Sequence, residues 1–316
     1  DRTISGWERG EHSPTEAKLK LIKNLSTFIP FKESSKKPSF TFIDLFAGIG
    51  GIRLPFQRLN GKCLFSSEWD RFAVKTYASN YGELPNGDIT KIPTYEIPSH
   101  DILLAGFPCQ AFSQAGLRKG FSDTRGTMFF EIQRILTEKQ PKAFLLENVK
   151  QLKGHDKGKT LKTILEILRG ENRQEIPPDY PVSDEVRNSI SKKLNYAVDF
   201  RVLKANNFGV PQKRERIYIV GFNREYFNNS NILDKKIHDM FSALEQKRSD
   251  TRLGDILEEN SSVDEKYTIS DRLLAGHIRR RKEHKVKGNG FGYSLFNKES
   301  SFCNTCLLYT SDAADE

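Results

Sequence analysis

Cysteine is scarce in this sequence: there are 4 among 316 residues, too few and too scattered to form the framework of a disulfide-stabilised domain. Such sparse use is typical of proteins in a reducing compartment, so we expect a cytoplasmic location. No apolar run reaches the roughly 18 residues that a membrane-spanning helix requires, and the N-terminus lacks the apolar core of a signal peptide. His277, His284 and the isolated pair Cys303 and Cys306 complete no ligand set, so no metal is expected.

Acidic residues are outnumbered by basic ones, 41 to 50, which gives a net charge of +9 at pH 7. A basic surface favours a polyanionic partner such as nucleic acid. Charge alone leaves open a basic protein that binds no nucleic acid, so the partner has to be argued from motifs.

The apolar runs are short, and each is flanked by turn residues or by stretches with helical periodicity. They lie at 40–46, 63–66, 101–105, 143–146 and 217–222. Short buried strands separated by helices predict an α/β fold with a doubly wound, mostly parallel sheet over residues 40–222. Residues 151–193 are polar and look in part like an insertion. Beyond residue 222 the alternation stops, and the charged segment 223–305 is interpreted as a smaller second domain.

Residues 1–30 are predicted to form a separate helical piece. Its helix start combines a Ser N-cap at Ser13, Pro14 at the first helical position and Glu16 three residues after the cap. The piece resembles part of a helix-turn-helix domain of the phage-repressor type; the alternative is a helical arm that only packs. Residues 31–39 are interpreted as a polar linker.

A glycine loop follows the first predicted strand. In the sequence DLFAGIGG, Phe46, Gly48 and Gly50 lie where a strand gives way to a helix. Glycine there lets the backbone turn tightly and approach a ligand. Taken alone, this loop also fits a nicotinamide dehydrogenase or a structural turn.

Acidic residues follow the loop at regular intervals. Glu68, next to Trp69, suits the hydroxyls of a ribose, and Asp88, next to Ile89, can accept a hydrogen bond from an adenine amino group. Trp69 and Ile89 would supply apolar surfaces for the adenine ring.

A cysteine occupies a loop directly after the apolar strand 101–105. Cys109 follows Pro108 in the sequence GFPCQAFS, at the position where ligands of parallel sheets react. A thiol is intrinsically very nucleophilic even when only a small fraction is ionised at pH 7. The alternative is a buried structural cysteine, but a loop of Gly, Pro, Gln and Ser is a poor place for an inert core thiol.

Charged residues lie at two further strand ends. Glu147 ends the apolar strand that begins at Ala143, and Arg214 and Arg216 precede the strand 217–222. The two arginines are two positions apart, so on a strand their side chains point to one face. The alternatives are a capping acid and a solvated strand entry.

Together these motifs carry a specific resemblance. The strings DLFAGIGG, EWD, GDI, GFPCQAFS, LLENV and PQKRERIYIVG have the order and spacing found in the DNA cytosine-C5 methyltransferases, which the region 40–222 resembles. The resemblance implies an S-adenosylmethionine-dependent methyltransferase with a Rossmann-like fold, which methylates cytosine C5 in double-stranded DNA as part of a bacterial restriction–modification system.

The resemblance also implies roles for individual residues. Cys109 would attack C6 of a flipped cytosine, Glu147 would hold N3 and the exocyclic amine, Arg216 would contact the base carbonyl, and Arg214 would support the Cys109 loop or the DNA backbone. The family's cofactor contacts fall on the following residues: Phe46, Gly48, Gly50, Glu68, Trp69, Asp88, Ile89, Pro108 and Met128. Gln110 and Ser113 are expected to contact DNA.

Target recognition is expected in 223–305. Residues 272–287 contain seven basic residues and one acid, and a glycine-containing stretch follows. A basic helix suits phosphates, and glycine lets a backbone approach a groove; the alternative is a solvated basic face. The predicted DNA contacts are Arg279, Arg280, Arg281, Lys282, Lys285, Lys287 and Gly290. We expect a monomer on its target, with a dimer through the helix-turn-helix as an option, and a cognate restriction endonuclease as a genetic partner.

Two other functions fit part of the same motifs. A DNA-binding regulator that keeps the fold would need no nucleophile, and a tRNA cytosine methyltransferase would share the motifs without needing a helix-turn-helix. The chain is expected to be truncated at both ends and inactive as written. Residues 306–316 resemble a translated sequencing adapter.

Overall fold

The structure is a computed structural model. It describes residues 28–107, 128–171, 183–228, 232–246, 251–288 and 292–305, together with residues 13, 15 and 16. Most of the predicted helix-turn-helix piece and the segment 306–316 lie outside these ranges. None of the helices within the ranges is long and apolar enough to cross a membrane.

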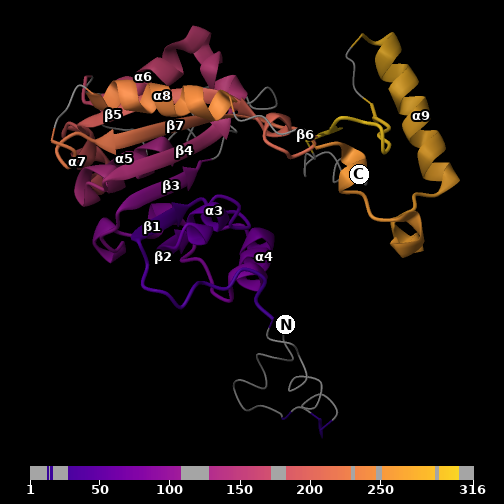
Figure 1. The fold of residues 1–316 in the computed structure, drawn as a ribbon, viewed down its shortest axis with the longest axis horizontal. Helices are drawn as coiled ribbons and strands as arrows, with labels where there is room; N and C mark the ends of the chain where they lie inside the picture. Colours follow the sequence, from indigo (N-terminus) through magenta and orange to yellow (C-terminus); the bar gives the residue numbers. More distant parts are fainter. Residues whose placement is uncertain are drawn as a thin grey trace.

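The described residues form a 6-stranded sheet and a separate pair of short strands, with helices around the sheet (Figure 1). The strands are β1 (Phe40–Leu45), β2 (Gly61–Ser67), β3 (Ile102–Gly106), β4 (Ala143–Val149), β5 (Tyr196–Lys204), β6 (Gln212–Lys213), β7 (Glu215–Asn223) and β8 (Cys303–Asn304). The α-helices are α3 (Arg53–Arg58), α4 (Arg71–Tyr81), α5 (Met128–Lys139), α6 (Lys159–Arg169), α7 (Asp184–Ile190), α8 (Ile232–Gln246) and α9 (Asp271–Val286).

The large sheet has the strand order β2-β1-β3-β4-β7-β5. Strands β2, β1, β3 and β4 pair in parallel, as predicted, whereas β7 pairs antiparallel to both β4 and β5. The α/β class and the mostly parallel sheet are therefore confirmed, with one reversed strand. Strand β5 has no counterpart among the predicted strands.

Alternation along the strands explains why helices cover both faces of the sheet. On one face, Ile43, Leu103 and Leu146 join the large core that also contains the apolar sides of α5, α6 and α7. On the other face, Phe42 and Leu104 join a small cluster beside α3, and β5 and β7 join one beside α8. The sheet is thus doubly wound. Because helices cover its two faces, the ends of its strands are the places where a ligand can approach.

Helix α6 corrects the interpretation of residues 151–193 as partly an insertion. Leu161, Ile164, Leu165 and Leu168 recur at helical spacing and are buried in the large core. The helix ends at Gly170, whose φ of 73° is the left-handed conformation common at helix C-termini. The described parts of this region, 151–171 and 183–193, are therefore part of the fold.

Helix α8 packs on the sheet beyond the boundary predicted at residue 222. Its residues Leu233, Ile237 and Phe241 pack against the sheet with Ala197 of β5. Beyond α8, helix α9 stands apart from the sheet, and β6 lies between them (Figure 1). Chain 303–304 returns to pair in parallel with β6.

Candidate active site

The described residues of the predicted catalytic and cofactor sites lie at one edge of the large sheet. Strands β1 to β4 run in the same direction, so their carboxyl ends meet there. Strand β7 runs the opposite way, so its first residues reach the same edge. The topology alone therefore brings the glycine loop, Glu147 and Arg216 together.

The glycine loop after β1 has an unusual backbone. Phe46, Gly48 and Gly50 have φ of 54°, 56° and 87°, and the first of these is costly for a bulky L-residue. Among the residues that the structure describes, no atom outside its chain neighbours lies within 4 Å of the position that a Cβ at Gly48 would take. These residues therefore leave room for a ligand beside the loop.

Glu68, at the end of β2, is hydrogen-bonded to this loop. Its Oε2 accepts from the backbone N–H of Gly48 at 2.8 Å, and its Oε1 accepts from the N–H groups of Trp69 and Asp70 at 2.9 and 2.8 Å. A carboxylate has about four acceptor positions, so one remains for a ligand hydroxyl. The indole of Trp69 is 79% exposed beside it.

The Asp88 segment forms the next part of this edge. Asp88 Oδ1 accepts from the backbone N–H and the hydroxyl of Thr90, at 3.0 and 2.8 Å. Its Oδ2 lies 3.8 Å from Nζ of Lys91, an exposed side chain. Ile89 is only 3% exposed and belongs to the large core, so its side chain is packed rather than open.

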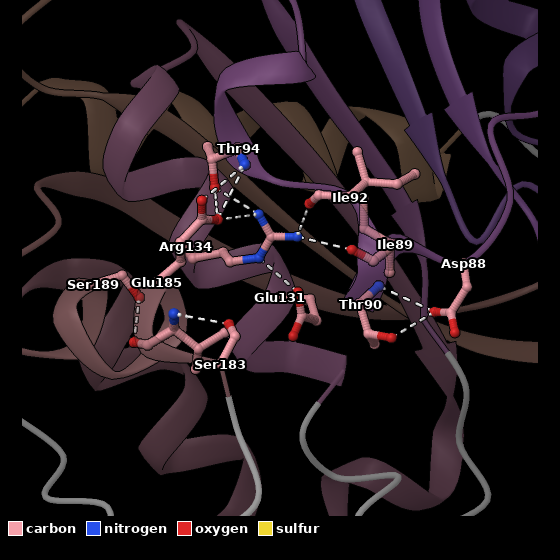
Figure 2. A network of polar contacts seen from close by, with 11 residues as sticks. Asp88, Ile89, Thr90, Ile92, Thr94, Glu131, Arg134, Ser183, Glu185 and Ser189 are labelled. Carbon is pink, nitrogen blue, oxygen red and sulfur yellow. Dashed lines mark hydrogen bonds and ion pairs between the residues drawn. The ribbon is translucent and has the colours of Figure 1, made fainter.

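Arg134 of α5 is hydrogen-bonded to the backbone of the Asp88 segment. Figure 2 shows Arg134 at the centre of a polar network. Its guanidinium donates to the carbonyls of Ile89 and Ile92, both at 2.8 Å, and contacts Glu131 at 2.6 Å and Glu185 of α7 at 3.0 Å. No local pattern in the sequence singles out Arg134, because its partners lie up to 51 positions away.

The structure brings Glu147 and the two arginines together at this edge. Arg216 Nε lies 2.9 Å and Arg214 Nη2 3.5 Å from the same carboxylate oxygen, Oε1. The other oxygen, Oε2, faces Gly106 at the end of β3. Burial, followed by the charge of Glu147, raises the pKa of the neighbouring Tyr218, so this phenol stays protonated.

The loop that contains Cys109 lies outside the described residues, as do Pro108, Gln110, Ser113 and Gly290. Its two ends are described. Asn148, which is 1% exposed, donates from Nδ2 to the carbonyl of Phe107 at 3.3 Å, and Met128 begins α5 at the far end. Asn148 therefore fixes the exit of the chain from β3 beside Glu147.

The basic segment of the C-terminal region forms α9, in which no residue is buried. Its predicted DNA contacts Arg279, Arg280, Arg281, Lys282 and Lys285 are exposed, as is Lys287 just beyond its end. The guanidinium of Arg281 lies 5.2 Å from the centroid of the Tyr293 ring. Because no apolar side of α9 is covered, the helix presents its charge to solvent.

Comparison with known sequences decides the family. The family model described as C-5 cytosine-specific DNA methylase matches residues 40–173 and 182–311. The chain belongs to this family. C-5 cytosine methylation of DNA, with S-adenosylmethionine as methyl donor, is thereby confirmed over the regulator, tRNA-methyltransferase and dehydrogenase alternatives.

Relatives within the methylase family are close. The type II methyltransferase M.SsoII of Shigella sonnei is 50% identical over 306 residues, which cover 96% of this chain and 72% of that protein. M1.ScrFI of Lactococcus lactis subsp. cremoris is 51% identical over 306 residues, covering 96% and 70%. The fold is similar to that of the solved Entamoeba histolytica methyltransferase EhMeth, with a TM-score of 0.57, 19% identity, and coverage of 85% and 71%.

The residues at the β1–β2 edge fit the methylase cofactor. Asp44 and Ser67 are 0% and 1% exposed, and their side-chain oxygens have no hydrogen-bond partner among the described residues. Such orphaned polar atoms beside a glycine loop are expected where a polar ligand completes the site. Trp69 offers an open aromatic face next to them.

Proposed function

We propose that this chain is the catalytic part of a type II DNA methyltransferase that methylates cytosine through a covalent bond from Cys109. The observation that carries the proposal is the placement of Glu147, with Arg216 and Arg214 on one oxygen, beside Gly106. Cys109 follows Gly106 by three residues, so covalent geometry keeps their Cα atoms within about 11 Å. A thiol, a carboxyl group and a cation can therefore share one base.

Each residue has a distinct task in this scheme. The Cys109 thiolate forms a bond to C6 of the cytosine, and the electron pair moves into the ring toward C5. Glu147 holds N3 and the exocyclic amine and gives a proton to N3 as charge builds up there. Arg216 contacts the base carbonyl, and Arg214 supports the loop or the DNA backbone. Loss of the C5 proton after methyl transfer then releases the thiolate.

The base has to leave the helix for these contacts to form. A stacked cytosine presents neither C6 nor its Watson–Crick edge to protein side chains, and flipping it costs a few kcal/mol. We assign Gln110 and Ser113, on the loop with Cys109, to contacts that stabilise the opened DNA.

The cofactor is assigned to the edge formed by β1, β2 and the Asp88 segment. When bound, S-adenosylmethionine supplies an electrophilic methyl group. Glu68 accepts from the ribose hydroxyls, Asp88 accepts from the adenine amino group, and Trp69 covers the adenine ring. The remaining assigned contacts are Phe46, Gly48, Gly50, Pro108 and Met128. Ile89 is left out because its side chain is packed in the large core.

Recognition of a double-stranded target is assigned to residues 251–305, and the catalytic domain to 40–246. The uncovered basic helix α9 supports this division, as does the packing of α8 on the sheet. Because M.SsoII and M1.ScrFI are named as type II methyltransferases, we place the protein in a restriction–modification system of the bacterial cytoplasm. It acts as a monomer on its target.

A mechanism-based trap tests the nucleophile. A DNA duplex with 5-fluorocytosine at the target position cannot lose its C5 substituent, so we expect it to remain covalently attached to the full-length enzyme through Cys109. Cys109→Ala should abolish both trapping and turnover and keep cofactor binding.

Cys63→Ala is the matched control. This thiol is 8% exposed, and burial raises its pKa to about 12, so it stays protonated. The control should trap DNA as the wild type does. Trapping that survives Cys109→Ala would reject Cys109 as the nucleophile.

A further inference from the structure

The last turn of α4 is hydrogen-bonded to the glycine loop. Asn80 Nδ2 donates to the carbonyl of Ile49 at 3.0 Å, and the hydroxyl of Tyr81 donates to the carbonyl of Gly50 at 2.6 Å. Tyr81 is 7% exposed, so its bond to the loop is shielded from water. A Cβ at Gly50 would collide with the Tyr81 ring, which explains glycine at this position.

The loop contains one strained residue. Phe46, Gly48 and Gly50 all adopt positive φ, which is costly for phenylalanine but not for glycine. A bulky residue in the left-handed region persists only where the surrounding contacts hold it there. Asn80 and Tyr81, which donate to the loop carbonyls, therefore help to set the loop conformation that faces the ligand.

A segment outside the catalytic motifs contacts the same turn of α4 from the other side. The backbone N–H of Phe31 donates to the carbonyl of Asn80 at 3.0 Å, and the centroids of the Phe31 and Tyr81 rings are 5.7 Å apart. Gln57 Nε2 of α3 donates to the Phe31 carbonyl at 2.7 Å. The start of the predicted linker is thus packed onto the domain, whereas residues 34–39 are exposed.

Arg53 connects the N-terminal segment to Tyr81. Its side chain is fully buried, its guanidinium carbon lies 4.2 Å from the centroid of the Tyr81 ring, and it donates to Glu33 Oε1 at 3.1 Å. It also donates to Glu83, beyond the end of α4. A buried guanidinium needs such partners. Glu33 therefore ties the N-terminal segment to the cation that packs against Tyr81.

We propose that Tyr81 is a positioning residue for the cofactor loop, and that the segment Phe31–Glu33 holds Tyr81 in place through Arg53. The proposal rests on the assignment of this loop to the cofactor. It implies that cofactor affinity depends on a segment that precedes all the catalytic motifs.

The test is calorimetric titration of the full-length enzyme with S-adenosylhomocysteine, which requires no turnover. Tyr81→Phe keeps the ring and removes the hydroxyl, so the dissociation constant should rise about fivefold, as expected for one buried hydrogen bond. The KM for the methyl donor should rise to the same extent, while kcat at saturating donor stays unchanged.

Tyr196→Phe is the matched control for this variant. Tyr196 is also buried, and its hydroxyl donates to the carbonyl of Pro141 at 2.9 Å, on the edge strand β5. It should lose similar stability and keep wild-type affinity. Wild-type affinity in Tyr81→Phe, or an equal loss in both variants, would overturn the proposal. Failure of the wild type itself to bind would instead reject the cofactor assignment.

Glu33→Gln tests the role of the N-terminal segment, with Glu83→Gln as its control. Both carboxylates pair with Arg53, but only Glu33 belongs to the segment. We expect the dissociation constant to rise two- to threefold, on the order of a weak partly exposed ion pair, in Glu33→Gln and less in Glu83→Gln. Equal increases of the dissociation constant in the two variants would show that the loop conformation depends on the pairing of Arg53 with any carboxylate, and not on the N-terminal segment.

Discussion

Replacing Arg134 by methionine should destabilise the fold strongly and in a pH-dependent way. The variant leaves Glu131, which is 5% exposed, without its cation. Removing one partner of a buried pair costs about 3–5 kcal/mol. The carbonyls of Ile89 and Ile92 also lose their donor, which adds about 1 kcal/mol. A total of about 4–6 kcal/mol is a large part of the 5–15 kcal/mol that typically stabilises a domain.

The sign of the pH dependence follows from Glu131. Burial raises the pKa of Glu131, and Arg134 lowers it, so the variant raises this pKa further. A carboxyl group with a raised pKa binds its proton more tightly in the folded state. The loss in the variant should therefore be smallest near pH 5 and should grow as the pH rises through the folded-state pKa.

Urea unfolding followed by circular dichroism at pH 5.5 and pH 8 measures both effects. The double variant Glu131→Gln with Arg134→Met removes the orphaned charge and should recover about half of the loss at pH 8. A loss of less than about 1 kcal/mol at both pH values, or no recovery in the double variant, would refute the assignment of the network as a buried, charge-paired support.

Three further predictions concern the site. Burial raises the pKa of Asp44 to about 7, so the contribution of Asp44 to the free energy of unfolding should fall by up to about 4 kcal/mol as the pH rises from 4 to 8. In urea unfolding, the wild type should therefore lose stability relative to Asp44→Asn as the pH rises, and a constant difference between the two proteins would contradict this. Glu147→Gln should lower kcat by about 10²- to 10⁴-fold in single-turnover assays with unchanged cofactor affinity; kcat within threefold of wild type would rule out proton transfer by this residue. Arg280→Ala on α9 should reduce the slope of log affinity against log salt concentration by about one phosphate contact. Lys236→Ala on α8 should leave this slope unchanged. Equal slopes in the two variants would count against α9 as the DNA-binding element.

The sequence predicted the parts of the fold that have strong local signals. The strands β1, β3 and β4 are short apolar runs bounded by turns, and the glycine loop follows β1 at the expected position. Strand β5 was missed because it lies at the edge of the sheet, where Asp199 and Arg201 interrupt its apolar residues. The helical spacing of Leu161, Ile164 and Leu168 was present in the sequence but was outweighed by the charged residues between them.

The supports of the site could not be predicted in the same way. Arg53 and Arg134 look like ordinary charged helix residues, yet they are 0% and 2% exposed. Arg53 is bonded to Glu33 and Tyr77, which lie 20 and 24 positions away. A local pattern of polarity places such residues on the surface, because it contains no information about a distant partner that would allow burial.

The reversed strand β7 is what makes the site possible. In an all-parallel sheet, Arg216 at the start of its strand would lie at the edge opposite to Glu147, which is near the end of β4. Arg216 would then lie opposite Ala143, four residues or about 13 Å along the strand from Glu147. Antiparallel pairing instead sets Val149 opposite Arg216, and brings the guanidinium to 2.9 Å from the carboxylate. The motif sequence contains the chemistry, but only the direction of the strand brings its two halves together.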